Sequence, residues 1–317
     1  MMIDRRQLIA GAGAAALAGA AAAQGATTAS PRVPVIDVHT HMYTRRWLDA
    51  LKASGDPDTV VVPGNPESIS YRGTNYAVLA PNMFDWNERI GKMDAAGVDV
   101  ALISLTAPNV YWGNVQQSIE AARIANDEYA EAQARHPRRV RWFASLPWDS
   151  ADEAIKELHR AMAAGAVGVC MLTNIKGQAL IEEKFAPVWA EIDRIDAPVF
   201  IHPTTPFVDG FGLGQYCMAN SVGFTTDTTT CFAKFLLSGF FERYPRVRPI
   251  ASHGGGTLPF LVGRLDRMWE ISAARRDISK PPSTYRRRIC CDSIVYDQRT
   301  LQDLIDTVGA DRVVEGS

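Results

Sequence analysis

The stretch Val33-Pro-Val-Ile-Asp-Val-His-Thr-His41 is a short apolar run that ends in two histidines. Two more apolar runs end in the same way, one at His202 and one at His253. Runs of this kind predict short buried strands, so each histidine lies where a strand ends and a loop begins. In a parallel α/β barrel, these strand ends meet on the face that carries the active site. The sequence therefore predicts that the four histidines share one site.

Strand-like runs alternate with amphipathic, helix-like stretches throughout the chain after residue 31. The eight candidate strands are Val35–Val38, Val98–Leu105, Val140–Leu146, Val167–Leu172, Val199–His202, Pro249–His253, Ile289–Ser293 and Arg312–Ser317. The candidate helices are Asn87–Gly97, Val115–His136, Ser150–Gly165 with Ser150 as N-cap, Lys184–Arg194 and Thr300–Gly309. Repeated strand-then-helix order with eight strands predicts an α/β fold, a (β/α)8 TIM barrel.

Two segments do not fit this alternation. Residues 49–86 are rich in Gly, Pro, Asn and Ser, and they predict an insertion after the first strand. Residues 203–230 are rich in Thr, Gly and Phe, and we expect them to form a long loop after the fifth strand. Because the functional loops of a barrel follow its strands, we expect both segments to lie over the catalytic face and to contact the substrate.

The bulk composition is that of an ordinary globular protein. The 317 residues are 47% hydrophobic and 21% charged, with a formal net charge of -2. That charge gives no attraction to nucleic acid or to an anionic membrane, so we expect neither as a partner. The five cysteines contain no CxxC pair, and three of them (Cys170, Cys290 and Cys291) lie in apolar runs. We expect buried thiols rather than disulfides.

The first 30 residues differ in composition from the rest. Arg5 and Arg6 precede an Ala- and Gly-rich run, which resembles a twin-arginine export signal. The run is too short and too weakly apolar for a lasting membrane span, and Ala21-Ala22-Ala23 offers a small-residue cleavage site. We therefore expect residues 1–30 to be a signal peptide, residues 31–317 to be the folded domain, and the protein to be periplasmic. An untargeted Ala-rich tail is the alternative.

The histidine spacing points to a metal site. An HxH pair on a strand presents both imidazoles to one face, because side chains alternate with a period of two. His39 and His41 can therefore bind one ion together, and His202 makes a third neutral ligand, the number typical of a catalytic zinc site. A bound ion lowers the pKa of its water towards ~7, and a histidine that is not a ligand can then move the proton. We expect His253 to be that histidine.

The same histidines stand in longer motifs. From Phe235 the chain reads Phe-Leu-Leu-Ser-Gly-Phe-Phe-Glu-Arg-Tyr-Pro, and from His253 it reads His-Gly-Gly-Gly-Thr-Leu-Pro-Phe-Leu-Val-Gly-Arg-Leu-Asp-Arg-Met-Trp. Cys291-Asp-Ser293 and Gly309-Ala-Asp-Arg-Val-Val-Glu-Gly-Ser317 follow. With the HxH of the first strand, these motifs resemble the amidohydrolase superfamily, in particular its aminocarboxymuconate-semialdehyde decarboxylase-like branch. The resemblance runs from about residue 33 to the end of the chain.

The resemblance implies a role for each site residue. It implies that His39, His41 and His202 bind one divalent ion, usually zinc, and that His253 is the acid/base acting on the metal-bound water. It also implies that Arg264 binds the substrate carboxylate, in a homodimer where this residue can serve the neighbouring subunit. A surface helix arginine is the alternative for Arg264. We expect Asp292 to hydrogen-bond within the barrel rather than to bind metal.

Two features depart from the family's pattern. The family's last metal ligand is an aspartate after Gly-Ser at the eighth strand end, whereas this chain ends at Ser317. We expect the sequence to be a C-terminally truncated form of a longer protein. The family's other substrate-binding arginine has no clear counterpart in Gly73-Thr-Asn-Tyr-Ala-Val78, and Arg72 is nearby but displaced.

The leading hypothesis is a metal-dependent, non-oxidative decarboxylase of a small unsaturated or aromatic carboxylic acid. A metal-dependent hydrolase of an ester, lactone or amide is the alternative on the same site, since the fold serves both reactions. Such hydrolases often carry a bridging lysine at the fourth strand end, but here Lys176 lies two residues beyond Cys170–Asn174, which favours a mononuclear site. The third hypothesis is an inactive fragment or a non-catalytic binding protein.

Overall fold

The computed structural model describes residues 32–204, 213, 216–271 and 277–317. The predicted signal peptide at residues 1–30 lies outside the described residues. Within the described part of the chain, no helix is long and apolar enough to cross a bilayer.

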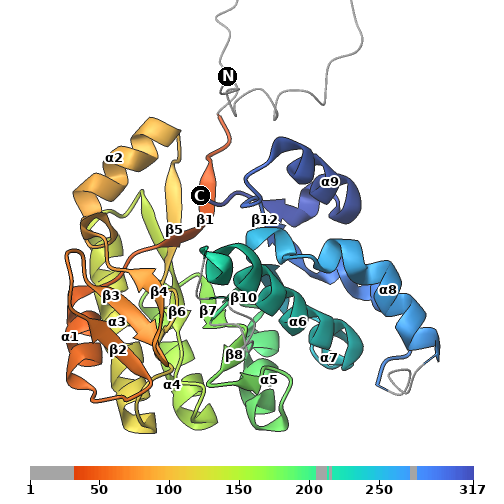
Figure 1. Cartoon of the computed structure of the whole chain (residues 1–317), viewed down its shortest axis with the longest axis horizontal. Coiled ribbons are helices and arrows are strands. Elements are labelled where there is room, and N and C mark those ends of the chain that lie inside the picture. The colour runs from red at the N-terminus through yellow and green to blue at the C-terminus, as the bar shows by residue number, and fades with distance from the viewer. Residues whose placement is uncertain (1–31, 205–212, 214–215, 272–276) are drawn as a thin grey trace, which may run out of the picture. The chain divides into compact units, whose positions relative to one another are not determined.

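Eight parallel strands form one sheet in the order β1-β5-β6-β7-β10-β11-β12-β13 (Figure 1). Their bounds are β1 Ile36–His41, β5 Val100–Ser104, β6 Val140–Ser145, β7 Gly168–Leu172, β10 Pro198–His202, β11 Arg248–Ala251, β12 Cys290–Asp292 and β13 Val313–Val314. The two edges of the sheet also join. The N–H of Val38 donates to the carbonyl of Glu315 at 2.9 Å, and the N–H of Ser317 donates to the carbonyl of His39 at 3.3 Å. These bonds close the predicted (β/α)8 barrel, which is confirmed.

Helices follow the strands along the chain and lie around the barrel (Figure 1). Their bounds are α1 Arg45–Ala53, α2 Trp86–Ala96, α3 Val115–Arg135, α4 Ala151–Ala163, α5 Ala186–Ile195, α6 Phe224–Leu237, α7 Phe240–Arg243, α8 Leu258–Ile271 and α9 Gln298–Val308. Asp85 caps α2 by accepting from two N–H groups of its first turn, and Asn114 forms a capping box with Gln117 at the start of α3. Ser150 stands at the predicted N-cap of α4, but its side chain makes no capping hydrogen bond.

The predicted insertion at residues 49–86 contains a separate antiparallel sheet. Its strands are β2 (Thr59–Val62), β3 (Ser68–Tyr71) and β4 (Thr74–Val78), paired in that order. Ile69 on β3 is fully buried in the main hydrophobic core, so the sheet is anchored to the domain by apolar packing.

The prediction of a loop over residues 203–230 is wrong for the second half of that segment. A π-helical turn, η4 (Ala219–Gly223), runs directly into α6. Threonine disfavours helix interiors because its hydroxyl competes for backbone groups. In α6 the hydroxyl of Thr229 instead hydrogen-bonds within the helix, because it donates to the carbonyl of Thr225, one turn earlier, at 2.6 Å. The helix therefore tolerates its threonine-rich start.

The interior of the barrel is filled by a small cluster of side chains from five strands: Val38, Phe143, Cys170, Phe200 and Ile250. A larger core lies between the strands and the surrounding helices. All five cysteines are free, as expected. Cys170 and Cys291 are buried, but Cys290 is only half-buried, so the prediction of a buried thiol is wrong for that residue.

Candidate metal centre

The first two candidate ligands come from β1. His39 and His41 are two residues apart on this strand, so their imidazoles project to the same side. Their Nε2 atoms lie 3.1 Å apart and their ring centroids 4.9 Å apart. The HxH pair therefore forms the paired geometry that its spacing predicts.

The third candidate ligand comes from the end of β10. The ring centroid of His202 lies 5.2 Å from that of His39 and 4.7 Å from that of His41. One ligand atom from each of the three residues lies within 4.8 Å of the other two. Because β1 and β10 are not neighbours in the sheet, only the closure of the barrel brings these rings together.

Each of the three imidazoles has an acceptor for its Nδ1 atom. The Nδ1 of His39 lies 2.5 Å from a carboxylate oxygen of Asp292, and that of His41 lies 3.0 Å from the hydroxyl oxygen of Ser104. The Nδ1 of His202 lies 2.8 Å from the carbonyl oxygen of Pro203. A proton held at Nδ1 leaves the lone pair of Nε2 free, which is the arrangement that metal-binding histidines adopt.

The three histidines fit a divalent ion. Two nitrogens bound tetrahedrally to one zinc ion at ~2.0–2.1 Å lie about 3.3 Å from each other, close to the 3.1 Å between His39 and His41. Burial lowers the pKa of His41 and of His202 well below the usual value. Both are therefore neutral, and neutral imidazole is the form that binds metal.

His253 lies beside this centre on a different element. It opens the short 3-10 helix η5 (His253–Gly255), two residues beyond β11, with a φ of 54°. Its ring centroid is 5.0 Å from that of His39 and 5.4 Å from that of His202. Phe224 stacks on it with 6.1 Å between centroids and 22° between planes. Burial, reinforced by His39, lowers the pKa of His253 to about 4, so its imidazole is a neutral base at neutral pH.

Asp292 joins the two parts of the site. It is fully buried, and its carboxylate accepts from the Nδ1 of His39 and from the backbone N–H groups of His253, Gly254 and Ile294. Burial alone would raise its pKa, but these hydrogen bonds, with that of His39 first, bring the pKa below the usual value. The predicted hydrogen bonding of Asp292 within the barrel is confirmed, and one carboxylate holds both a candidate ligand and the His253 backbone.

Three basic residues named in the sequence analysis have described surroundings. Arg264 is exposed on α8, and within the described part of the chain its guanidinium has no hydrogen bond or ion pair. Lys176 pairs with Asp149 at 2.6 Å, and Arg72 pairs with Asp58 at 3.1 Å.

Two residues at the centre were not foreseen from the sequence. Ser104, which holds His41, ends β5, and its position at a strand end beside β1 is a signal that could have identified it. Arg89 donates to the carbonyl of His41 at 3.0 Å from α2. Nothing local distinguishes Arg89 from a surface helix arginine.

The chain matches the Amidohydrolase family over residues 36–317. It is 27% identical over 290 residues to the 2-amino-3-carboxymuconate-6-semialdehyde decarboxylase of Dictyostelium discoideum. This alignment covers 89% of this chain and 80% of that protein. It is 30% identical over 247 residues to the gamma-resorcylate decarboxylase of Rhizobium radiobacter. This second alignment covers 71% of this chain and 74% of that protein.

Solved structures share the fold. The crystal structure of a 2,6-dihydroxybenzoate decarboxylase in complex with 2,6-dihydroxybenzoate superposes with a TM-score of 0.73 at 25% identity, covering 90% of this chain and 88% of that one. A dihydroxybenzoic acid decarboxylase from Polaromonas sp. JS666, with bound manganese and the inhibitor 2-nitroresorcinol, superposes with a TM-score of 0.72 at 24% identity, covering 89% and 85%.

Proposed function

The chain belongs to the amidohydrolase family. We propose that it is a metal-dependent, non-oxidative decarboxylase of a small aromatic or unsaturated carboxylic acid. The observation that carries the proposal is the meeting of the three imidazoles of His39, His41 and His202 with a fourth, that of His253. The relatives described above are named decarboxylases of aminocarboxymuconate semialdehyde, resorcylate and dihydroxybenzoate, which supports this class of substrate.

We propose zinc as the resident ion, held by His39, His41 and His202. A set of neutral imidazoles suits zinc. The Polaromonas enzyme binds manganese, which supports a divalent ion and makes manganese the competing identity.

The proposed reaction exchanges a carboxyl group for a proton. The carbon–carbon bond to the carboxylate breaks, its electron pair stays on the substrate carbon, and CO2 leaves. That carbon then takes a proton. We assign its delivery to His253, whose ring centroid lies 5.0 Å from that of His39. A divalent ion held by His39, His41 and His202 would supply positive charge to stabilise the negative charge that develops on the substrate. Asp292 fixes the backbone of His253 relative to His39, because its carboxylate accepts a hydrogen bond from each of them.

We propose that Arg264 binds the substrate carboxylate of a neighbouring subunit in a homodimer. Its face of α8 also exposes apolar side chains at helical spacing: Phe260, Met268 and Ile271, with exposed fractions of 58%, 40% and 60%. Exposed apolar side chains grouped in this way are typical of interaction surfaces. A guanidinium that has no partner among the described residues suits a carboxylate from outside.

The test is CO2 release by the purified protein loaded with zinc or with manganese, assayed on a panel of hydroxybenzoic and unsaturated acids. We expect release that stops on chelation and returns with metal. His253→Ala should abolish it, and His159→Ala is the matched control, since His159 pairs with Glu191 on the outer helices at 2.7 Å. Release of an alcohol or amine from esters, lactones or amides, with no CO2 from any acid, would establish the hydrolase instead.

We also propose that residues 1–30 direct export to the periplasm by the twin-arginine route. The support is the Arg5-Arg6 pair before an Ala-rich run. Cell fractionation should find the wild-type protein in the periplasm and the Arg5→Lys, Arg6→Lys double variant in the cytoplasm. The same distribution for both proteins would refute the proposal.

A further inference from the structure

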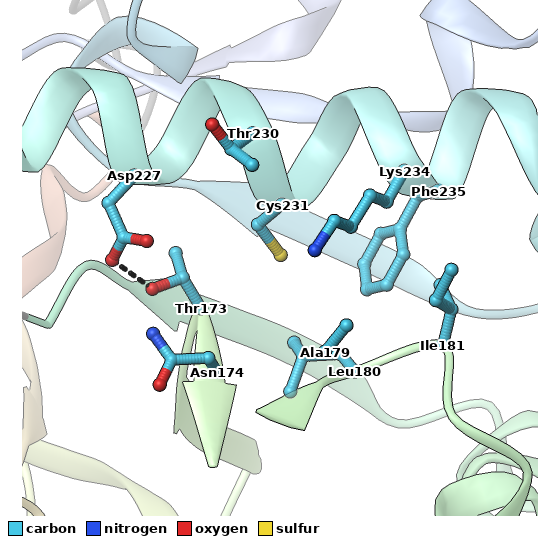
Figure 2. A pocket seen from close by; sticks show the side chains of 10 residues that line it. All are labelled: Thr173, Asn174, Ala179, Leu180, Ile181, Asp227, Thr230, Cys231, Lys234 and Phe235. Atoms are coloured by element: carbon cyan, nitrogen blue, oxygen red, sulfur yellow. Dashed lines mark hydrogen bonds between the residues drawn. The ribbon is translucent and has the colours of Figure 1, made fainter. Parts of the chain in front are cut away.

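A buried carboxylate lies outside the histidine cluster, on α6. Asp227 is only 5% exposed, and it lines a small cavity together with Thr173, to which it is directly hydrogen-bonded (Figure 2). One of its oxygens, Oδ2, accepts two hydrogen bonds, from the hydroxyl of Thr173 and from the backbone N–H of Thr204 at 3.0 Å. Thr173 directly follows β7 and Thr204 follows β10, so Asp227 ties two strand ends to one helix.

The peptide unit between Pro203 and Thr204 connects this carboxylate to a candidate metal ligand. Its N–H donates to Asp227, and its carbonyl oxygen lies 2.8 Å from the Nδ1 of His202. Because a peptide unit is planar and rigid, fixing the N–H also fixes the direction of the carbonyl. Thr173 makes a second connection between the two residues. Its hydroxyl donates to Asp227, and its backbone N–H donates to the carbonyl of His202 at 3.0 Å.

The hydrogen bonds from Asp227 through the Pro203–Thr204 peptide favour the tautomer of His202 that carries its proton on Nδ1. A carboxylate that accepts from an N–H polarises the peptide and strengthens its carbonyl as an acceptor. A stronger acceptor at Nδ1 holds the proton there and leaves the Nε2 lone pair for the ion. His39 receives the same help directly from Asp292.

We propose that Asp227 is a positioning residue, which fixes the tautomer and the orientation of His202 through the Pro203–Thr204 peptide and thereby raises the metal affinity of the centre. The inference rests on the proposed metal centre but not on the reaction catalysed there. The cavity beside Asp227 has a volume of about 20 Å³, which is room for a single water molecule. The carboxylate therefore serves the strand ends, not a substrate bound beside it.

Metal affinity tests the proposal without any activity assay. Zinc would be titrated against a chromogenic chelator at pH above 7 for the wild type, Asp227→Asn and Asp227→Ala. We expect Asp227→Ala to weaken zinc binding by about 10-fold to 100-fold. Asp227→Asn keeps an acceptor oxygen but loses the charge, so we expect a smaller loss of about threefold to tenfold. Thr230→Ala, on the same helix and cavity, is the control and should bind zinc as the wild type does.

The tautomer supplies a second readout, which a merely structural role would not change. In the metal-free protein with 15N-labelled histidine, the His202 shifts should report a proton on Nδ1 in the wild type and a mixture of tautomers in Asp227→Ala. Asp227→Asn is nearly isosteric and keeps the measurement possible if Asp227→Ala does not fold. Zinc affinity in Asp227→Asn equal to the wild type, or a loss in Thr230→Ala as large as in Asp227→Ala, would overturn the proposal. If the zinc affinities change as expected but the protein releases no CO2 from any acid, only the proposed function is refuted.

Discussion

The carboxylate of Asp292 lies 2.5 Å from the Nδ1 of His39 and 2.9 Å from the backbone nitrogen of His253. One fully buried side chain thus sets both the direction of a candidate metal ligand, His39, and the position of the proposed acid/base, His253. Carboxylate–histidine pairs of this kind orient the ring and increase its basicity.

Replacing Asp292 should therefore damage metal binding and the fold together. We expect Asp292→Ala to weaken zinc binding by about 10-fold to 100-fold, and to lower the free energy of unfolding by about 3 kcal/mol, because buried N–H groups lose their acceptor. Chelator competition and urea unfolding measure the two effects. Asp303→Ala, an exposed change on α9, is the control and should alter neither.

Replacing His253 should lower catalysis without lowering the metal content, in contrast to replacing a candidate metal ligand. We expect His253→Asn to lower kcat by about 10²-fold to 10⁴-fold, because a proton carrier is lost. The variant should bind about as much zinc per chain as the wild type does, since His253 is outside the three-ligand cluster. Metal analysis alongside steady-state kinetics makes the distinction. A variant that loses its zinc would instead make His253 a ligand.

Asp227 should make folding stability depend on pH. Burial raises its pKa from 3.8 to about 6, so the folded protein holds this proton more tightly than the unfolded chain does. Its contribution is then most favourable below pH 3.8 and is lost as pH rises through about 6. Lys234 and Cys231 are the other ionisable groups that line the cavity, and the nearby Lys234 moderates the shift.

The expected size of this effect is about 3 kcal/mol, since one pKa unit corresponds to roughly 1.4 kcal/mol. Urea unfolding of the wild type and of Asp227→Asn should show the asparagine variant gaining relative stability by up to that amount between about pH 4 and about pH 7. A difference between the two proteins that does not change over this range would contradict the assignment.

The glycine at position 256 should resist substitution. Its φ is +65°, and an added Cβ would lie 2.3 Å from the carbonyl oxygen of Thr225, at the start of α6. We expect Gly256→Ala to lower the free energy of unfolding by about 2–4 kcal/mol, through backbone strain and the clash. Gly91→Ala, inside α2 with open space around it, should instead raise stability by about 0.5–1 kcal/mol. Denaturant unfolding of both variants tests the contrast.

The proposed dimer makes a complementation prediction. Arg264→Ala and His253→Ala should each be inactive alone, but a mixed dimer contains one site with both native residues if Arg264 acts on the neighbouring subunit. Mixing the two variants after partial unfolding and refolding should restore activity. Activity in the Arg264→Ala protein alone, or none after mixing when heterodimers have formed, would refute the arrangement.

Much of the barrel could be predicted because its signals are local. Short apolar runs with helical stretches between them define the strands from β1 onward, and the period of two in the HxH pair places His39 and His41 on one side. The α6 start was missed, because its threonines have low intrinsic helix propensity and their hydroxyls are satisfied only once the helix exists.

The sequence by itself determined the barrel and the placement of the four histidines at strand ends, because periodicity and apolar runs are properties of neighbouring residues. Only the tertiary structure decided the partners of those histidines. Asp292 is 253 residues away from His39, and Asp227 reaches His202 through a peptide carbonyl that no side-chain pattern records. The physical reason is that a buried carboxylate must find its donors, and which donors lie within reach depends on how the closed barrel brings distant strand ends together.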